Sequence, residues 1–149
     1  MEDRLASQAE QLHRALTELV KHYHLRDRND ICCHGISVSQ CYALTALGEH
    51  DTLTMQALAD GLQLAISTVT RLVDQLVDKQ LVQRHSAPHD RRVCCVSLTA
   101  EGSRLLQTIE GEFIAREQAI LQRIPADARD HVVWAVEELS RAVNACCQT

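Results

Sequence analysis

Apolar residues recur at helical spacing near both ends of the chain. In residues 2–25 they step by three or four positions and form one narrow stripe, which consists of Leu5, Ala9, Leu12, Leu16, Leu19 and Tyr23. After Pro125 a second stripe has the same spacing and consists of Val132, Val136, Leu139, Val143 and Cys146. Apolar residues with this period lie on one face of a helix. The pattern therefore predicts two terminal helices that each pack against another helix.

Local capping signals predict where the next helix begins. Ser37 and Gln40 have the spacing of a capping box, and Ile36 and Cys41 occupy the two positions of a hydrophobic staple. The helix that they start is expected to end near Gly48, because glycine is typical of helix C-termini.

Thr54 is a second capping residue and predicts a short helix over residues 55–60. Residues 61–64 then predict a tight turn, and residues 65–79 predict a longer helix. The buried face of that longer helix is expected to consist of Leu72, Val73, Leu76 and Val77. Its outward side chains are expected to be Ser67, Thr68, Thr70, Arg71 and Gln75. Two helices joined by a short turn that contains glycine form a helix-turn-helix.

Two strands are predicted next, at residues 81–85 and 93–98, with the polar and basic segment 86–92 between them. A hairpin directly after a helix-turn-helix is a wing. Cys94 and Cys95 alternate across the second strand, and both are expected to be structural. Thr99 can cap a long helix that reaches about Arg123 and ends before Pro125. The expected fold class is mainly α: a winged helix-turn-helix with a small β-hairpin wing and terminal helices that form a dimerisation region.

Length and composition fit one domain with a real core, since the chain has 149 residues and 46% of them are hydrophobic. No stretch approaches eighteen consecutive apolar residues, so no membrane span is expected. The N-terminal residues are charged and carry no apolar segment typical of a secretory signal. We therefore expect a cytoplasmic protein.

The net charge of −5 is unevenly distributed. Residues 1–64 carry five Lys or Arg and nine Asp or Glu, and residues 96–149 carry five and eight. Residues 65–95 carry five and three, so the predicted recognition helix and wing form the one positive stretch. This distribution is compatible with a local basic surface on an acidic body.

Seven cysteines are present, with no export signal and no CxxC pair. The odd count and the three vicinal pairs argue against a disulfide scaffold, and the thiols are expected to be reduced. No Ser-His-Asp set, glycine-rich phosphate loop or paired acidic site is evident, so an enzyme is not expected.

Five motifs in residues 53–102 together resemble the MarR family of winged-helix repressors. They are LA..L at 58–62, STVTRLVDQL at 67–76, LVQR at 81–84, P.DRR at 88–92 and LT..G at 98–102. The motif region covers about a third of the chain, and the flanking helices fit the family layout. Two positions depart from the family pattern, which often has Asp where Ala87 stands and Gly where Gln80 stands. Gln80 is therefore expected to take a mildly strained backbone conformation.

The resemblance implies a single MarR-like chain, 1–149, that forms a homodimer through residues 1–36 and 104–149. Residues 37–103 would be the DNA-binding region, with a recognition helix in the major groove and a wing at the adjacent minor groove. The implied partner is double-stranded DNA with a pseudo-palindromic operator. A small-molecule, metal or oxidant inducer would act in the cleft between the two regions.

DNA contacts are expected from the recognition helix and the wing. The recognition-helix residues are Ser67, Thr68, Thr70 and Arg71, and the wing residues are Arg84, Asp90, Arg91 and Arg92. Hydroxyls can bond phosphates or base edges, and arginine can bind guanine in a bidentate manner. Arg92 matches the family's wing-tip arginine and Asp90 its orienting partner, whereas Arg91 and Arg84 fit phosphate contacts or surface charges. The alternative reading of the helix residues is a solvated face.

The stretch ICCHGISVSQC at residues 31–41 gathers Cys32, Cys33 and Cys41 near the implied signal cleft. Three thiolates can hold a soft metal or metalloid ion, and an oxidisable thiol with a resolving partner can sense an oxidant. Structural thiols beside a site for an organic ligand are the alternative. Zinc binding by His13, His22 and His24 is disfavoured, because His22 and His24 point in different directions on one helix.

The leading hypothesis is a dimeric DNA-binding repressor that is released by a signal at this cysteine cluster. A MarR-like repressor that responds to an organic ligand is one alternative. Another is a thiol-based metal-binding or redox protein that uses the winged helix for protein interaction. Salt-dependent binding to a specific operator separates the repressor from the last of these.

Overall fold

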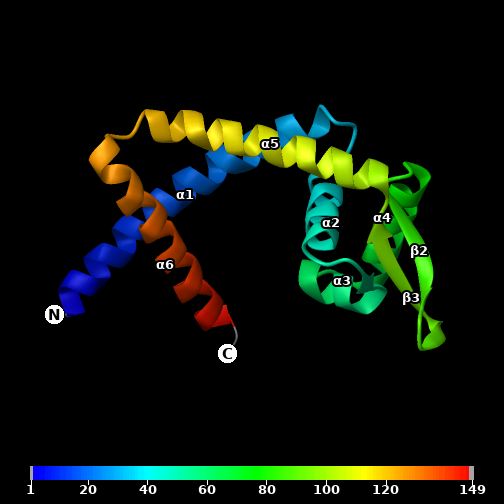
Figure 1. Cartoon of the computed structure of the whole chain (residues 1–149). Helices are drawn as coiled ribbons and strands as arrows, with labels where there is room; N and C mark the ends of the chain where they lie inside the picture. Colours follow the sequence, from blue (N-terminus) through cyan, green and yellow to red (C-terminus); the bar gives the residue numbers. More distant parts are fainter. Residues whose placement is uncertain (1, 148–149) are drawn as a thin grey trace. The chain divides into compact units, whose positions relative to one another are not determined.

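The computed structural model describes residues 2–147, with the side chains of residues 2, 32 and 147 outside the description. Its elements are α1 (Glu2–Cys32), α2 (Val38–Glu49), β1 (Leu53–Thr54), α3 (Met55–Leu62), α4 (Ile66–Asp78), β2 (Val82–Ala87), β3 (Asp90–Leu98), α5 (Ala100–Gln122), a 3-10 turn η1 (Ala126–Ala128) and α6 (Arg129–Cys147) (Figure 1). The chain divides into two compact units, Met1–Gln107 and Thr108–Thr149. The mainly helical winged helix-turn-helix expected from the sequence is confirmed.

Helix α1 is longer than predicted, because it continues from residue 25 to Cys32. The polar residues 26–30 had indicated a connection, but they contain no proline or glycine that would stop a helix. Arg26 also stacks over the ring of Tyr23 at 4.1 Å, one turn earlier. Ile31 is buried and extends the apolar series. Cys32 is therefore the last helical residue, and Cys33 begins the turn to α2.

The predicted start of α2 is confirmed in detail. The Ser37 hydroxyl accepts a hydrogen bond from the Gln40 amide, and the Ser37 amide donates to the Gln40 side-chain oxygen, each at 3.1 Å. Ile36 and Cys41, the two staple residues, are both buried. The Thr54 cap of α3 is also present, with its hydroxyl accepting from Ala57 N at 3.0 Å.

The turn between α3 and α4 differs from the prediction. Gly61 lies inside α3, and Gln63 takes the left-handed conformation with φ 54°. The sequence predicted that this helix ends before Gly61, but α3 continues to Leu62. The strained conformation expected at Gln80 is confirmed, with φ 60° directly after the end of α4.

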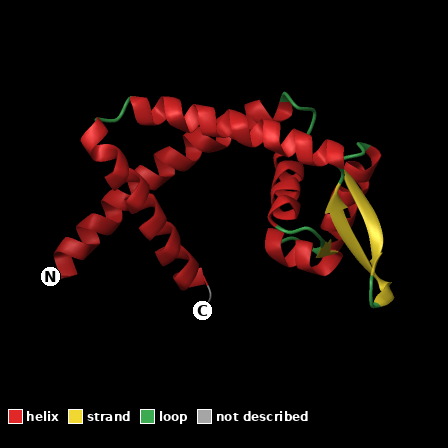
Figure 2. Cartoon of the chain, in the orientation of Figure 1, coloured by secondary structure: helices red, strands yellow, loops and turns green. Residues whose placement is uncertain are grey.

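Three antiparallel strands form the sheet, in the order β1-β3-β2. The third strand, β1, was not predicted because two residues are too short to show an alternating pattern. The hairpin is longer than expected, since β2 reaches Ala87 and β3 begins at Asp90 (Figure 2). Only Pro88 and His89 form its turn. Polar side chains extend these strands because the part of the hairpin near its turn is mostly exposed, as at residues 83–86 and 91–92.

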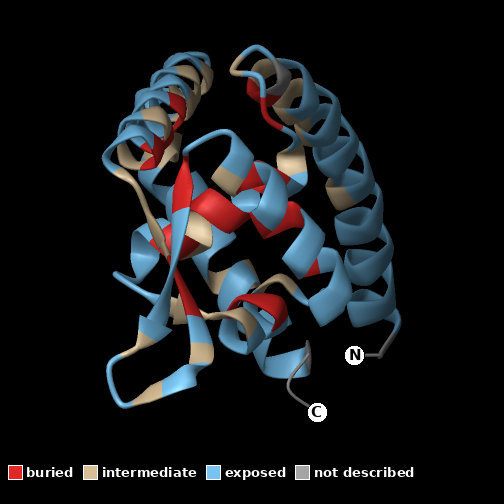
Figure 3. Ribbon diagram, turned by 90° about the vertical axis from the view of Figure 1, so that its right-hand side faces the viewer, coloured by how far each residue is buried: buried red, intermediate tan, exposed pale blue. Residues whose placement is uncertain are grey.

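The core of the first unit lies where α2, α3 and α4 pack with the sheet (Figure 3). The residues that α4 buries there are Val69, Leu72, Val73 and Leu76. Val77, expected to be buried, is half-buried instead. Cys95 is buried beside Val96 in β3, as its structural role requires, whereas Cys94 is exposed and does not join the core.

Helix α5 starts at the predicted Thr99 cap and leads into the second unit. The Thr99 hydroxyl accepts from Gly102 N at 3.0 Å and donates to Gln80 O at 2.6 Å. The second unit consists of the rest of α5, η1 and α6, and Pro125 precedes η1. Within residues 2–147 no helix has the length and apolar character needed to cross a membrane.

Gly102 is the position where the start of α5 lies against the end of the recognition segment. A Cβ atom there would lie 1.9 Å from the carbonyl oxygen of Leu81, a backbone atom that cannot move aside alone. We expect Gly102→Ala to lower the free energy of unfolding by about 1–3 kcal/mol through overpacking, despite the higher helix propensity of alanine. Urea unfolding at one fixed protein concentration measures this change.

Gly111 provides the matched control for this prediction. It lies in the same helix, but no atom outside the local backbone approaches its Cβ position within 4 Å. Gly111→Ala is expected to leave the free energy of unfolding unchanged or to raise it by up to about 1 kcal/mol. Equal effects of the two substitutions would contradict the close contact at Gly102.

Candidate nucleic-acid interface

Helix α4 has two chemically distinct faces. Its apolar face is buried in the core, and its opposite face presents the predicted residues Ser67, Thr68, Thr70 and Arg71, all of them exposed. The side chains that can bond phosphates or base edges therefore lie together over the first two turns of the helix. In the part of the chain that the structure describes, the side chain of Arg71 forms no ion pair.

The three hydroxyls on this face differ in what they can still bond. Thr70 Oγ1 donates to the carbonyl of Ile66 at 2.8 Å, so this hydroxyl can only accept a further hydrogen bond. Ser67 and Thr68 have no side-chain hydrogen bond to another described residue. Their hydroxyls can therefore donate to phosphate oxygens or to base acceptors.

Ile66 and Ala65 extend this surface, and the sequence interpretation did not include them. Ile66 is the first residue of α4, and its side chain is 48% exposed. Ala65 caps the helix without a side-chain hydrogen bond, so the first amides of α4 remain open to an anion. The signal in the sequence that could have indicated the exposure of Ile66 is its position ahead of the buried series that begins at Val69.

At the tip of the wing, Asp90 holds Arg92 in one orientation. Asp90 Oδ1 accepts from Arg92 N at 2.9 Å and from Arg92 Nε at 3.1 Å, and Asp90 Oδ2 accepts from Arg92 Nη2 at 3.2 Å. These hydrogen bonds from Arg92 lower the pKa of Asp90 below its ordinary value. The Arg92 side chain is nevertheless 91% exposed, so its guanidinium is oriented and still accessible.

The other two predicted wing arginines lie in different surroundings. Arg91 is exposed on β3 and has no ion pair with another described residue. Arg84 of β2 is bound to the carboxylate of Asp74 on α4, and its Nη2 lies 3.5 Å from Thr70 O. Arg84 therefore joins the wing to the recognition helix, and part of its charge is neutralised.

The two described thiols of the cysteine cluster differ in their exposure. Cys33 is exposed in the turn after α1, and its Sγ lies 3.3 Å from Asn29 O. Cys41 is buried in α2 with 3% exposure, and the Cys32 thiol lies outside the described residues. Among the described residues, no group of three or more His, Cys, Asp or Glu is arranged to hold a metal ion.

Beside the turn that carries Cys33 there is a cavity of about 400 Å³. Its lining consists of His34, Gly35, Ile36, Lys79, Leu81, Glu101 and Leu105. It therefore combines an apolar wall with groups of both charges and lies between the α1–α2 turn, the end of α4 and the start of α5. Such a lining suits a small organic molecule that carries a polar group.

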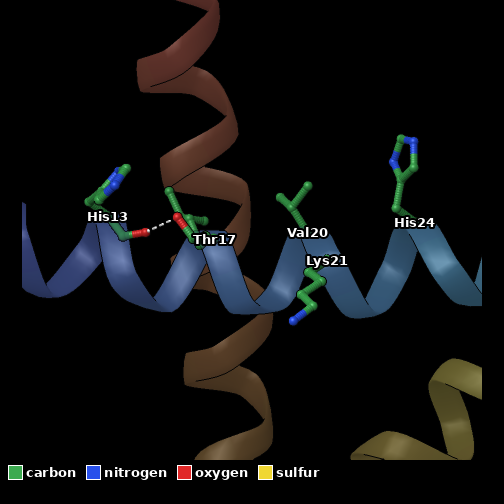
Figure 4. A pocket seen from close by; sticks show the side chains of 6 residues that line it. His13, Thr17, Val20, Lys21 and His24 are labelled. Atoms are coloured by element: carbon green, nitrogen blue, oxygen red, sulfur yellow. Dashed lines mark hydrogen bonds between the residues drawn. The ribbon is translucent and has the colours of Figure 1, made fainter.

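The histidines of α1 do not form a shared site. His13 and His24 both line a hollow along α1 with Leu16, Thr17, Val20 and Lys21 (Figure 4). These two histidines are eleven positions apart, which is about 16 Å along a helix. His22 lies 3.7 Å from Glu18 instead. This spacing excludes one zinc ion held by His13 and His24 together.

Comparison with known proteins gives a consistent family. The model of the MarR family matches residues 34–93. The transcriptional regulator MhqR of Bacillus subtilis is 30% identical over 108 residues, 72% of each chain. The transcriptional repressor MdtR of Bacillus subtilis is 33% identical over 89 residues, which are 60% of this chain and 55% of MdtR.

The fold is also shared with solved structures. Streptococcus pneumoniae FabT, solved in complex with DNA, superposes with a TM-score of 0.80 over 93% of this chain and 99% of FabT. The sequence identity is 17%, so this likeness concerns the fold.

The Asp90–Arg92 pair can be tested through the titration of Asp90. Arg92→Ala is expected to raise the pKa of Asp90 toward its ordinary value, because the side-chain donors, which are the largest cause of the lowering, are removed while the backbone amide of position 92 remains. Carboxyl carbon NMR measured against pH gives this value. The pKa of Asp90 is lower in the folded protein than in the unfolded chain. The stability that its contact with Arg92 contributes is therefore fully present above the pKa of an unfolded aspartate, and it is lost as the pH falls through the folded pKa.

Arg91→Ala is the control, since this neighbouring charge makes no hydrogen bond to Asp90. It should leave the Asp90 titration unchanged. An equal rise of the pKa in both variants would show that the general charge of the wing, and not the hydrogen-bonded pair, lowers it.

Proposed function

The chain belongs to the MarR family of DNA-binding transcriptional regulators, which are not enzymes, and we propose that it is a homodimeric repressor of a pseudo-palindromic operator. The observation that carries this proposal is the oriented, exposed Arg92 at the wing tip, in the same unit as the hydroxyl-bearing face of α4. MdtR, which is a transcriptional repressor, and FabT, which was solved with DNA, support the direction of the proposal.

In the proposed complex, α4 enters the major groove and the hairpin reaches the adjacent minor groove. Ser67, Thr68 and Thr70 bond phosphates and base edges, and Arg71 reaches guanine. Ile66 places an apolar side chain where thymine methyl groups lie. Arg92 enters the minor groove, whose narrow form attracts a planar guanidinium. Arg91 binds backbone phosphates, and Arg84 does so with the part of its charge that Asp74 leaves unneutralised.

The proposed dimer uses residues 1–36 and 104–149, with residues 37–103 binding DNA. The occupant of the apolar helix faces is a second copy of the chain. In α1, Leu5, Leu12 and Leu19 keep between 45% and 69% of their surface exposed although they form the regular stripe. In α6, Trp134 and Val136 are likewise exposed. Exposed apolar series of this extent mark protein interfaces, and two copies match the symmetry of a palindrome.

For the signal, we propose that the exposed thiol of Cys33 reacts first. Its adjacent partner in sequence is Cys32, and Cys41 would have to leave its buried position to join a three-thiolate metal site. An organic peroxide would instead transfer its terminal oxygen to the thiolate, which gives a sulfenic acid and releases the alcohol. An organic ligand in the cavity beside His34 is the alternative, favoured by the mixed lining of that cavity.

The wing is tested by Arg92→Ala. Removing this guanidinium is expected to lower operator affinity about tenfold or more, in line with the roughly 1–3 kcal/mol of one good arginine contact to DNA. The melting temperature should stay near that of the wild type, because the side chain is exposed. Fluorescence anisotropy with the DNA next to the chain's own gene, at several salt concentrations, measures the effect.

Arg123→Ala is the matched control, because it removes one exposed arginine directly after the end of α5, outside the recognition helix and the wing. Unchanged operator affinity in the Arg92 variant at moderate salt would count against the wing assignment. Binding that does not distinguish this DNA from random DNA would refute the repressor itself and favour a winged helix used for protein interaction.

The thiol signal is tested by adding arsenite, mercuric ion, cuprous ion and an organic peroxide in turn to the reduced protein on its operator. We expect one agent to release the DNA, and Cys32→Ser or Cys33→Ser to abolish that release. Cys94→Ser is the control, since Cys94 is also exposed but lies on β3. Operator binding that is indifferent to all four agents would exclude thiol sensing and leave the organic ligand.

A further inference from the structure

Gln40 is the one buried polar side chain among the described residues, with 5% exposure. A buried amide has to find hydrogen-bond partners, and an unpaired one is costly. The capping box accounts for only one of its contacts, the hydrogen bond from Ser37 N to its side-chain oxygen. The remaining contacts of Gln40 reach the recognition helix.

Two residues at the end of α4 complete these contacts. Gln40 Nε2 donates to Gln75 Oε1 at 2.9 Å, across 35 positions of the sequence. Lys79 Nζ donates to Gln40 Oε1 at 3.1 Å and also to the carbonyl oxygen of Gly35 at 2.5 Å. Lys79 is the residue that caps the C-terminus of α4. One connected network therefore joins the α1–α2 turn, the first turn of α2 and the last turn of α4.

This network restrains α2 and α4 in a way that apolar packing does not. Apolar contacts between α2 and α4 allow small shifts of one helix against the other, because they have little directional preference. Hydrogen bonds with fixed partners do not tolerate such shifts equally well. Gly35 lies two residues after Cys33, and Gly35 also lines the cavity beside His34. A change at this turn would alter the position of the acceptor that Lys79 uses.

We propose that Gln40, Gln75 and Lys79 are positioning residues that set the orientation of the recognition helix and link it to the α1–α2 turn. The network holds α4 in the arrangement that fits the operator. A modification or ligand at the turn withdraws the Gly35 carbonyl from Lys79 and loosens the helix. This inference rests on the proposed function, because it explains how a signal in the turn reaches the DNA-binding surface.

The test uses substitutions at the two exposed members of the network, Lys79→Met and Gln75→Met, which remove the hydrogen bonds and keep the apolar stems. Both are expected to lower the preference for operator over random DNA by about fivefold to hundredfold, the usual range of coupling between two sites. Lys79→Arg and Gln75→Glu retain a donor and an acceptor, respectively, and should largely restore the preference.

Lys21→Met is the matched control for charge, because Lys21 and Lys79 are the two lysines of the chain. The loss of affinity for random DNA in Lys79→Met should not exceed that in Lys21→Met, since the network affects orientation and not phosphate attraction. An unchanged preference for operator in both methionine variants, with the wild-type melting temperature, would overturn the inference.

A second readout needs no DNA. The amide of His34 donates to Ile31 O at 3.0 Å within the turn. Gln75→Met, which lies in α4, is expected to accelerate hydrogen exchange at this amide, and Gln75→Glu is not. Equal exchange rates in the wild type and Gln75→Met would overturn the link. If the wild type fails to prefer its operator, the proposed repressor is wrong, while the exchange rates still decide whether the network connects the turn to α4.

Discussion

The winged helix-turn-helix depends on the burial of one face of α4. Val69 and Val73 are fully buried, and Leu72 and Leu76 lie on the same side of the helix. A rotation of the helix by about a quarter turn would expose some of these residues and bury hydroxyls and a guanidinium, which is strongly unfavourable without partners. The apolar face therefore determines which side chains can meet DNA. The exposure of Ser67, Thr68 and Arg71 is therefore a consequence of the burial of neighbouring residues in the same helix.

The wing is determined by a different constraint, because most of its side chains contribute no core. Strand β3 pairs with both β1 and β2, and its inner end is anchored by Cys95 and Val96 in the core. Beyond that anchor the hairpin is held by its backbone ladder and by short-range pairs. Arg84 bound to Asp74 fixes the wing to α4, and Asp90 orients Arg92 within the strand. The wing can thus remain polar at its tip without losing its direction.

Local signals in the sequence predicted much of this arrangement. The caps at Ser37, Thr54 and Thr99 depend on residues three positions apart, so a reading of the sequence finds them. The periodicity of α4 likewise indicates its buried face. The left-handed conformation of Gln63 was missed, because a neighbouring glycine offered a more obvious turn.

Interactions between distant segments were not predictable in the same way. Nothing near Gln75 in the sequence indicates that its amide meets Gln40, and it was expected only to point outward. The cysteine cluster shows the same limit, since proximity in the sequence does not reveal whether its thiols meet in space. A helix that continues to Cys32 and a staple that buries Cys41 separate the environments of the described thiols. Whether residues that are close in the sequence can act together depends on which of them are buried in the core.

The net negative charge of the chain also affects how strongly it attracts DNA. Residues 65–95 are positive, whereas both flanking segments are negative. A chain that was basic throughout would bind any phosphate backbone, because that attraction does not depend on sequence. Here the general attraction is weakened by the rest of the chain, so in the proposed complex the binding depends on close contacts that α4 and the wing make in one orientation. Under the proposed function, the discrimination between operator and random DNA is sensitive to the angle of α4, and small hydrogen-bonded restraints on that helix can control a large change in occupancy.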